Sequence, residues 1–163
     1  DYDEFTVSRD TYGFVVVEVE GGAEPKFTMK RISRGNPDAP ADNVLADEIT
    51  IWRDNQPPAT PTLTMPSCSS DPVLTASAFS DPDGHAHQGT HWQLGPDCTF
   101  ATVVSEHWKQ ARNEFKDVDT QADDDLTDEL FTELSSGGCA RVRYRDEGLQ
   151  WSDWSDGVTV TCR

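Results

Sequence analysis

Basic side chains are scarce in this sequence. Thirteen lysines and arginines stand against 30 aspartates and glutamates, which gives a formal net charge of −17 at pH 7. No basic stripe exists, so nucleic acid and anionic membrane surfaces are poor candidates as partners. No apolar run is long enough to span a bilayer. No C-x-x-C pair and no G-x-S-x-G turn occurs, so neither a zinc ribbon nor a serine nucleophile elbow finds support.

The cysteines are few, and all of them lie in the second part of the chain. They are Cys68, Cys98, Cys139 and Cys162. An even number at wide spacing in a strand-rich region predicts two disulfides and an oxidising compartment, extracellular or periplasmic. The acidity agrees with a secreted protein kept soluble by its charge; the alternative is a set of scattered carboxylates for divalent cations.

Residues 1–55 contain three segments with the composition of β-strands. These segments are Phe14–Glu20, Lys26–Ser33 and Asp47–Trp52. The second one alternates apolar and polar residues imperfectly, which predicts a bulge near Lys30, and a polar loop is expected at 35–43. Three strands cannot close a sandwich or hide two sheet faces. We therefore expect an N-terminal partial β-sheet that belongs to a larger, upstream domain.

A proline-rich segment at 56–61 separates this sheet from the rest of the chain, as an extended linker or as the lead-in to a new strand. Beyond it, residues 62–163 show short strand-like segments divided by turn residues, which favours an all-β antiparallel sandwich. The expected strands are Thr62–Met65, Val73–Phe79, His91–Leu94, Phe100–Val104, Ala140–Arg145 and Val158–Thr161. Ser105–Phe115 fits either a short helix, since apolar residues recur there at helical spacing, or an irregular strand.

The last third of the chain carries a resemblance to a known family. Strict alternation in Ala140–Arg145 places three arginines on one side of a strand, and the sequence Trp-Ser-Asp-Trp-Ser follows at 151–155. This W-S-x-W-S sequence resembles that of the fibronectin type III domains in class I cytokine receptors. Together with Phe79–Gly84 and His91–Leu94, it also looks like a group of bacterial secreted modules. The resemblance implies a fibronectin type III/immunoglobulin-like β-sandwich over 62–163.

Indole faces attract guanidinium groups, so we expect the motif to form a structural ladder with the arginines before it. The ladder residues are Arg141, Arg143, Arg145, Trp151, Ser152, Trp154 and Ser155. The alternative is an aromatic carbohydrate platform that also uses Trp52. The fibronectin-type topology further implies two disulfide pairs, Cys68 with Cys162 and Cys98 with Cys139.

The segment Asp81–His87 offers two carboxylates in a turn and an H-x-H sequence. A calcium site, or a zinc or copper site, is therefore an alternative to a plain turn, with Asp81, Asp83, His85 and His87 as its ligands. The fibronectin-type resemblance instead makes this segment a turn between two core strands, with both histidines exposed on the loop. We expect that turn and no cofactor.

The N-terminal pattern D-x-Y-G-F-V-V-V-E-V-x-G-G, followed by K-F-T-M-K-R, resembles the closing strands of secreted calcineurin-like metallophosphoesterases. Those strands carry no metal ligands, and the resemblance places the family's metal motifs D-x-H, G-D, N-H-E and G-H-x-H in an upstream active site. The resemblance implies a non-catalytic C-terminal region whose partner is the upstream catalytic domain of the same polypeptide. The alternatives are a β-hairpin without that kinship and an independent cell-surface module that recognises protein or glycan.

Overall fold

The computed structural model describes residues 7–8, 11–64, 73–115, 118–121, 125–131 and 137–160. Within these ranges every regular element is a β-strand, as the sequence predicted. No helix there is long and apolar enough to cross a membrane.

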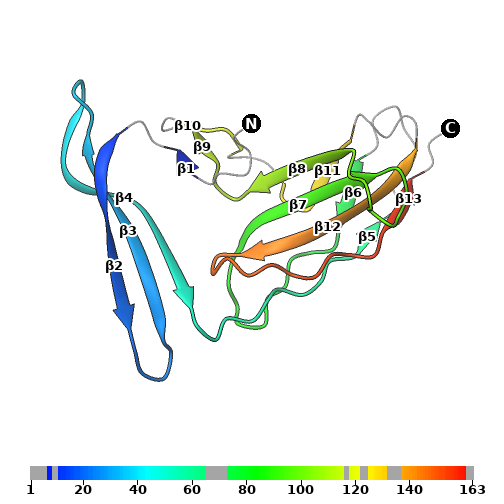
Figure 1. The fold of residues 1–163 in the computed structure, drawn as a ribbon, viewed down its shortest axis with the longest axis horizontal. Helices are drawn as coiled ribbons and strands as arrows, with labels where there is room; N and C mark the ends of the chain where they lie inside the picture. Colours follow the sequence, from blue (N-terminus) through cyan, green and yellow to red (C-terminus); the bar gives the residue numbers. More distant parts are fainter. Residues whose placement is uncertain are drawn as a thin grey trace.

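The strands form four sheets (Figure 1), which are ordered β2-β3-β4, β1-β9-β10, β11-β6-β5 and β13-β12-β7-β8. Their bounds are β1 Val7–Ser8, β2 Tyr12–Glu20, β3 Lys26–Gly35, β4 Pro40–Trp52, β5 Leu63–Thr64, β6 Val73–Ala76, β7 His87–Gly95, β8 Ser105–Gln110, β9 Glu114–Phe115, β10 Val118–Asp119, β11 Asp128–Leu130, β12 Gly138–Asp146 and β13 Val158–Val160. All neighbouring strands are antiparallel except β1 and β9.

The β2-β3-β4 sheet contains the three predicted strands, with one of them longer than expected. Strand β4 begins at Pro40, so part of the segment 35–43 is strand and not loop. The chain reverses before it at Asn36, whose Oδ1 accepts the backbone N–H of Ala39 at 2.8 Å. The pairing of β3 with β4 shifts its register between Arg31 and Ile32, next to the expected bulge at Lys30.

The two faces of this sheet differ in chemistry. On one face Lys30 Nζ lies 2.6 Å from a Glu18 oxygen, and the hydroxyls of Thr28 and Thr50 lie 3.0 Å apart. The register of the three strands places seven apolar residues on the opposite side, here called the apolar face. They are Val15, Val17, Val19, Phe27, Met29, Ile49 and Ile51. None of the seven is buried.

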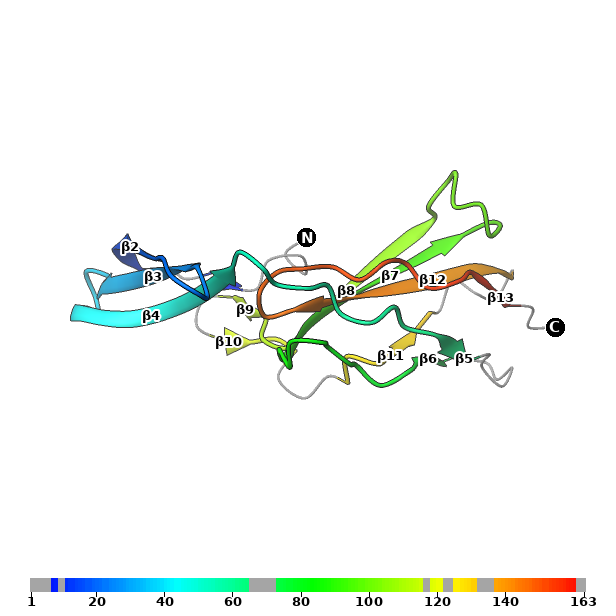
Figure 2. The ribbon, with the colours of Figure 1, turned by 90° about the horizontal axis from the view of Figure 1, so that it is seen from below.

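The second part of the chain is a sandwich of two layers, seen edge-on in Figure 2. The β11-β6-β5 sheet covers one face of the β13-β12-β7-β8 sheet, and their inner side chains form the core. That core consists of Leu74, Ala76, Trp92, Leu94, Phe131, Ala140, Val142, Tyr144 and Val160. The predicted alternation of β12 is therefore confirmed, because Ala140, Val142 and Tyr144 are fully buried while the arginines between them point outward.

The helix considered for Ser105–Phe115 is wrong, because residues 105–110 pair with β7 as strand β8. Successive side chains of β8 point to opposite faces. His107 stacks on Phe131 at 4.5 Å on the inner side, and Trp108 stacks on His91 at 3.8 Å on the outer side. Each face of β8 is thus packed.

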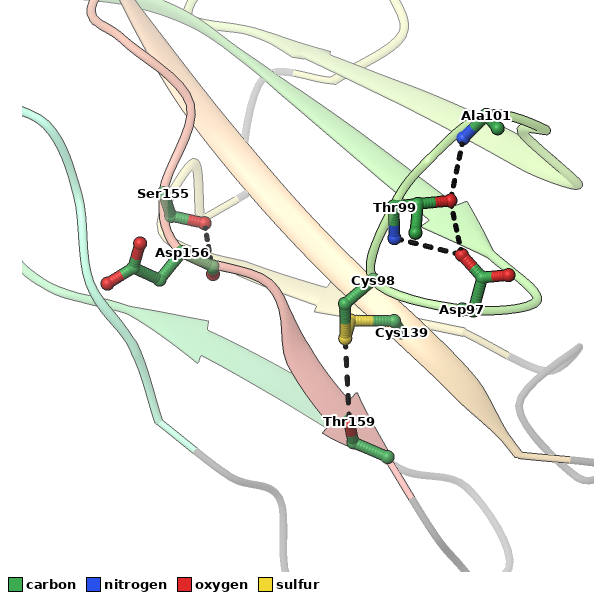
Figure 3. The surroundings of a disulfide bond; sticks show 8 residues. All are labelled: Asp97, Cys98, Thr99, Ala101, Cys139, Ser155, Asp156 and Thr159. Carbon is green, nitrogen blue, oxygen red and sulfur yellow. Dashed lines mark hydrogen bonds between the residues drawn. A yellow bond between two sulfur atoms is a disulfide. The ribbon is translucent and has the colours of Figure 1, made fainter.

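The strand expected at Phe100–Val104 is also wrong, since these residues form a loop. Phe100 has a φ of 51°, in the left-handed region that does not continue a strand. The loop is tied down by a disulfide between Cys98 and Cys139, drawn in Figure 3, with a Cα–Cα distance of 5.1 Å. This is the pairing that the sequence predicted. Cys68 and Cys162, the other expected pair, lie outside the described residues.

The proline-rich segment 56–61 runs along the sandwich. Together with Trp52–Asn55 before it, this segment forms the junction between the N-terminal sheet and the sandwich. Pro58 and Pro61 are buried, and Ala59 donates its backbone N–H to Ser80 at 2.9 Å. Just before it, Asn55 Nδ2 donates to the buried carboxylate of Asp146 at 2.9 Å. The contacts order this segment although it contains no strand.

Candidate functional site

The outer face of the four-stranded sheet carries the predicted arginines and tryptophans in contact with one another. The guanidinium carbon of Arg141 lies 4.3 Å from the centroid of the Trp154 ring. That of Arg143 lies 4.4 Å from Trp151 and 4.5 Å from Trp154, so it is held between the two indoles. Arg145 completes the series at 5.2 Å from Trp151. The positive groups and the rings alternate, as cation–π attraction favours.

The two serines of the motif supply hydrogen bonds that a neighbouring strand would otherwise make. The backbone N–H of Tyr144 donates to Ser152 Oγ at 3.0 Å, and Ser152 N donates back to the Tyr144 carbonyl at 2.9 Å. Ser155 makes the same pair of bonds with Val142, at 3.1 and 2.8 Å. Strand β13 pairs only with Gly138–Ala140. Residues 151–155 therefore satisfy the remaining edge of β12.

Three further residues, absent from the predicted ladder, hold its arginines in place. Gln93 Oε1 accepts two bonds from Arg141, at 2.9 and 2.7 Å. Gln110 Oε1 accepts one from Arg145 at 2.7 Å. Phe100 covers the other side of Arg141, with the guanidinium carbon 4.2 Å from its ring. The sequence held no signal for these contacts, because they depend on which strands become neighbours of β12.

His91 forms the centre of the face and was missed in the same way. Its ring stacks on Trp108, its Nε2 lies 2.7 Å from Glu106, and its Nδ1 lies 3.1 Å from an Arg143 nitrogen. Burial lowers the pKa of His91 to about 4. At neutral pH the ring is uncharged, so Nε2–H donates to the Glu106 carboxylate and Nδ1 accepts from Arg143. His91 thus links the arginine ladder to β8 without adding a charge.

These contacts decide what the outer face can do chemically. A sugar ring binds to an aromatic platform through the exposed face of the indole. Arg141 and Arg143 already occupy faces of Trp154, and Arg143 and Arg145 occupy Trp151. Trp52, the third residue of the platform alternative, lies at the junction and stacks on His85 at 4.4 Å. The indole faces of Trp151 and Trp154 are thus used to pack the arginines of the same sheet.

The second candidate site is the turn at Asp81–His85. Asp81, Asp83 and His85 each offer one ligand atom, and these atoms lie within 4.8 Å of one another. Asp81 Oδ1 accepts the backbone N–H groups of Asp83 and His85, at 2.9 and 3.0 Å. Asp83 accepts from Gln56 N at 2.6 Å and from Gln56 Nε2 at 3.0 Å. The carboxylates thus already stabilise the turn and bind it to the junction.

The expected exposure of the two histidines is wrong. His85 is half-buried under Trp52, with 14% of its side chain exposed. His87 opens strand β7 and stacks on Phe79 at 4.4 Å, and its Nε2 lies 2.9 Å from the Thr90 hydroxyl. Burial lowers the pKa of His87 to about 4. Ring contacts with Trp52 for His85, and with Phe79 and Tyr144 for His87, hold both rings inward.

This segment also contains two letter patterns of the metallophosphoesterase motifs that the sequence interpretation overlooked. Asp83-Gly84-His85 matches D-x-H, and Gly84–His87 matches G-H-x-H. The two matches overlap and share His85, so they cannot serve as two separate ligand loops. His87 points into the core and is not part of the cluster around Asp83. The patterns therefore do not form a dinuclear centre in the structure.

A pocket of about 320 Å³ lies beside this turn at the junction. Its lining includes Glu24, Trp52, Asp54, Asp83 and His85. Three carboxylates give it an acidic character, in keeping with the charge of the whole chain.

No protein-family model matches this sequence, and no curated protein matches it either. The functional interpretation thus depends on the residues and their geometry.

Proposed function

We propose that this chain is the non-catalytic C-terminal region of a secreted multidomain protein, a calcineurin-like metallophosphoesterase, in which it acts as a spacer and interaction module. Residues 62–163 supply the spacer as a fibronectin type III-like sandwich. The β2-β3-β4 sheet supplies the contact with the upstream catalytic domain. The disulfide between Cys98 and Cys139 supports secretion to an extracellular or periplasmic space, because disulfides persist in oxidising compartments.

The observation that carries the proposal is the uncovered apolar face of the β2-β3-β4 sheet. Val15, Val17 and Val19 are 59%, 55% and 80% exposed, and no part of the described sandwich covers them. A contiguous apolar surface of this kind marks a site of protein association. The opposite face of the same sheet carries ion pairs such as Lys30 with Glu18, together with the apolar side chains of Phe14 and Val16. The face with Val15, Val17 and Val19 is therefore the one that we expect the upstream domain to cover.

The arrangement of the sandwich supports the fibronectin-like part of the proposal. The first two strands of the sandwich, β5 and β6, share a three-stranded sheet with β11, and the other four strands form the facing sheet. Such a division into two antiparallel sheets is the architecture of fibronectin type III domains. The W-S-x-W-S segment lies on the outer face of the larger sheet, and its two serines hydrogen-bond to the edge of β12.

Phosphoesterase assays on two polypeptides test the proposal. The 163-residue chain should hydrolyse neither phosphomonoesters nor phosphodiesters with added Mn²⁺, Fe²⁺ or Zn²⁺, because its described residues bring no dinuclear ligand set together. The same chain preceded by its natural upstream sequence should be active. Turnover by the short chain that disappears in His85→Ala or Asp83→Ala would refute the non-catalytic role. An inactive long polypeptide would refute the identity of the parent protein.

A further inference from the structure

The outer edge of β2 is an open strand edge. This nine-residue strand stands at the end of the β2-β3-β4 order, and its backbone groups bond to β3 alone among the described residues. All nine residues are exposed. At the lower end of the sheet in Figure 1, β4 lies on the side of the sandwich and β2 on the far side, and no described strand pairs with the outer edge of β2. A row of unpaired N–H and C=O groups of this length is a template for another strand.

The opposite edge of the sheet is protected in ways that β2 is not. Strand β4 begins with Pro40, carries Asp42, Asp47 and Glu48, and contains the register shift. Asp47 is also held by Arg112 of the sandwich part at 3.2 Å. Proline, charge and covering contacts are the usual means of blocking an edge. Between Tyr12 and Val19, β2 has one charged residue and neither lysine nor proline.

We propose that β2 pairs with β2 of a second copy of this chain, antiparallel across a two-fold axis near Val16, to form a continuous six-stranded sheet. Charge selects this arrangement. With the axis at Val16, Glu18 faces Phe14 and Glu20 faces Tyr12, so that carboxylates meet uncharged residues. A parallel pair would place Glu18 against Glu18, and an axis at Val19 would place Glu18 opposite Glu20. Like charges directly opposite each other destabilise a strand pair.

The geometry also limits the assembly to two copies. Each chain contributes the same edge to an isologous contact, and that contact consumes the open edge of both chains. The β4 edges remain at the two ends of the new sheet, where they keep their protection. The apolar face stays on one side of this sheet and remains available to the upstream domain. Dimerisation therefore uses a surface different from the one in the proposed function.

Sedimentation velocity of the 163-residue chain over a wide concentration range tests the dimer. We expect a reversible monomer–dimer equilibrium. Val17→Lys puts two cations beside the axis and should weaken dimerisation about tenfold. Val44→Lys is the matched control, because Val44 has the same 55% exposure as Val17 but lies on β4. Both variants should keep the melting behaviour of a folded chain.

A site-directed cross-link checks the register. Val16→Cys brings two thiols together at the axis, with Cβ atoms about 4.5–5.5 Å apart, so that a small movement of the two strands allows a disulfide to form. After mild oxidation we expect a peptide that joins residue 16 to residue 16, and no such peptide from Val44→Cys. A chain that stays monomeric at all concentrations would overturn the proposal. So would equal weakening by the two lysine variants, polymers larger than the dimer, or equal cross-linking at both cysteine positions.

Discussion

A few side chains at the C-terminal end replace interactions that normally come from backbone. Ser152 and Ser155 each accept an N–H from β12 and return one through their own backbone. A buried N–H group without an acceptor costs about 1–3 kcal/mol. Both hydroxyls therefore stabilise the fold, because they accept the backbone N–H groups of Val142 and Tyr144. The tryptophans beside them anchor the same segment through the arginines. Hydroxyl and indole thus act on the same short stretch of chain from two sides.

Removal of either indole tests the structural role of the ladder. We expect Trp151→Ala or Trp154→Ala to lower the free energy of unfolding by about 1–3 kcal/mol, because packing and cation–π contacts with Arg143 are both lost. Trp154→Phe keeps a ring face and should cost less. Urea denaturation measures the change. An alanine variant that melts like the parent but loses binding to a glycan array would favour the carbohydrate platform instead.

His91, the buried histidine that contacts the ladder, makes the free energy of unfolding depend on pH. Burial lowers the pKa of His91 from 6.5 to about 4 in the folded chain, so the unfolded chain takes up the proton first as the pH falls. The contribution of the uncharged His91 to the free energy of unfolding is complete above about pH 6.5 and is lost progressively between pH 6.5 and pH 4. At pH 5 the loss amounts to about 2 kcal/mol. Denaturation at pH 7.5 and pH 5 should show a smaller difference for His91→Gln than for the parent chain. Equal differences would contradict this role.

At the scale of elements, the strands that alternate could be predicted from sequence and the contacts between strands could not. The pattern of Ala140–Arg145 fixed both faces of β12, because every second residue is apolar and the arginines need an outer face. Ser105–Phe115 misled the interpretation, because Trp108, Ala111 and Phe115 recur at helical spacing although residues 105–110 form strand β8. His91 and Gln93 showed their roles only once β7 was known to be the neighbour of β12.

Loops were the other weak point of the sequence interpretation. Residues 100–104 have strand-like composition, but the disulfide at Cys98 and the positive φ of Phe100 hold them as a loop. The inward rotation of His85 and His87 could not be read from an H-x-H spacing, because it depends on Trp52 and Phe79, which come from other parts of the chain.

The disulfide of that loop should contribute substantially to stability. It closes a segment of 41 residues, for which chain entropy gives a stabilisation of about 4 kcal/mol. Replacement of Cys98 and Cys139 together by serine should lower the denaturation midpoint accordingly. Peptide mapping under non-reducing conditions should also recover a Cys68–Cys162 link. A peptide that joins Cys68 to Cys98, or free thiols, would contradict the expected pairing.

For the whole molecule, the junction between the N-terminal sheet and the sandwich is the decisive region. Its bonds come from both sides: Asn55 reaches Asp146, Gln56 reaches Asp83, and Trp52 covers His85. The proline-rich segment thus fixes the position of the N-terminal sheet relative to the sandwich. This is the property that a spacer needs if it is to hold a catalytic domain at a fixed distance.

Limited proteolysis measures how firmly the junction is held. Asp83→Ala removes both acceptors of Gln56, and we expect faster cleavage at 55–60 than in the parent chain. Asp97→Ala is the matched control, because Asp97 is an exposed carboxylate that binds only Thr99 within its own loop. Millimolar Ca²⁺ or EDTA should leave the cleavage rates unchanged. Protection by Ca²⁺ that is lost in Asp83→Ala would show that the turn is a calcium site.

The spacing within W-S-x-W-S restricts how the gene can change in length. Ser152 and Ser155 are three residues apart, yet they bond Tyr144 and Val142, which are two apart on β12. The segment therefore repeats every three residues while the strand beside it repeats every two. Loss or gain of one codon between the two Trp-Ser pairs would turn Trp154 away from Arg141 and Arg143, and at the same time turn Ser155 away from the N–H of Val142. Substitutions at Asp153, between the pairs, leave this match intact, so this position should tolerate replacement where an insertion or deletion would not be tolerated.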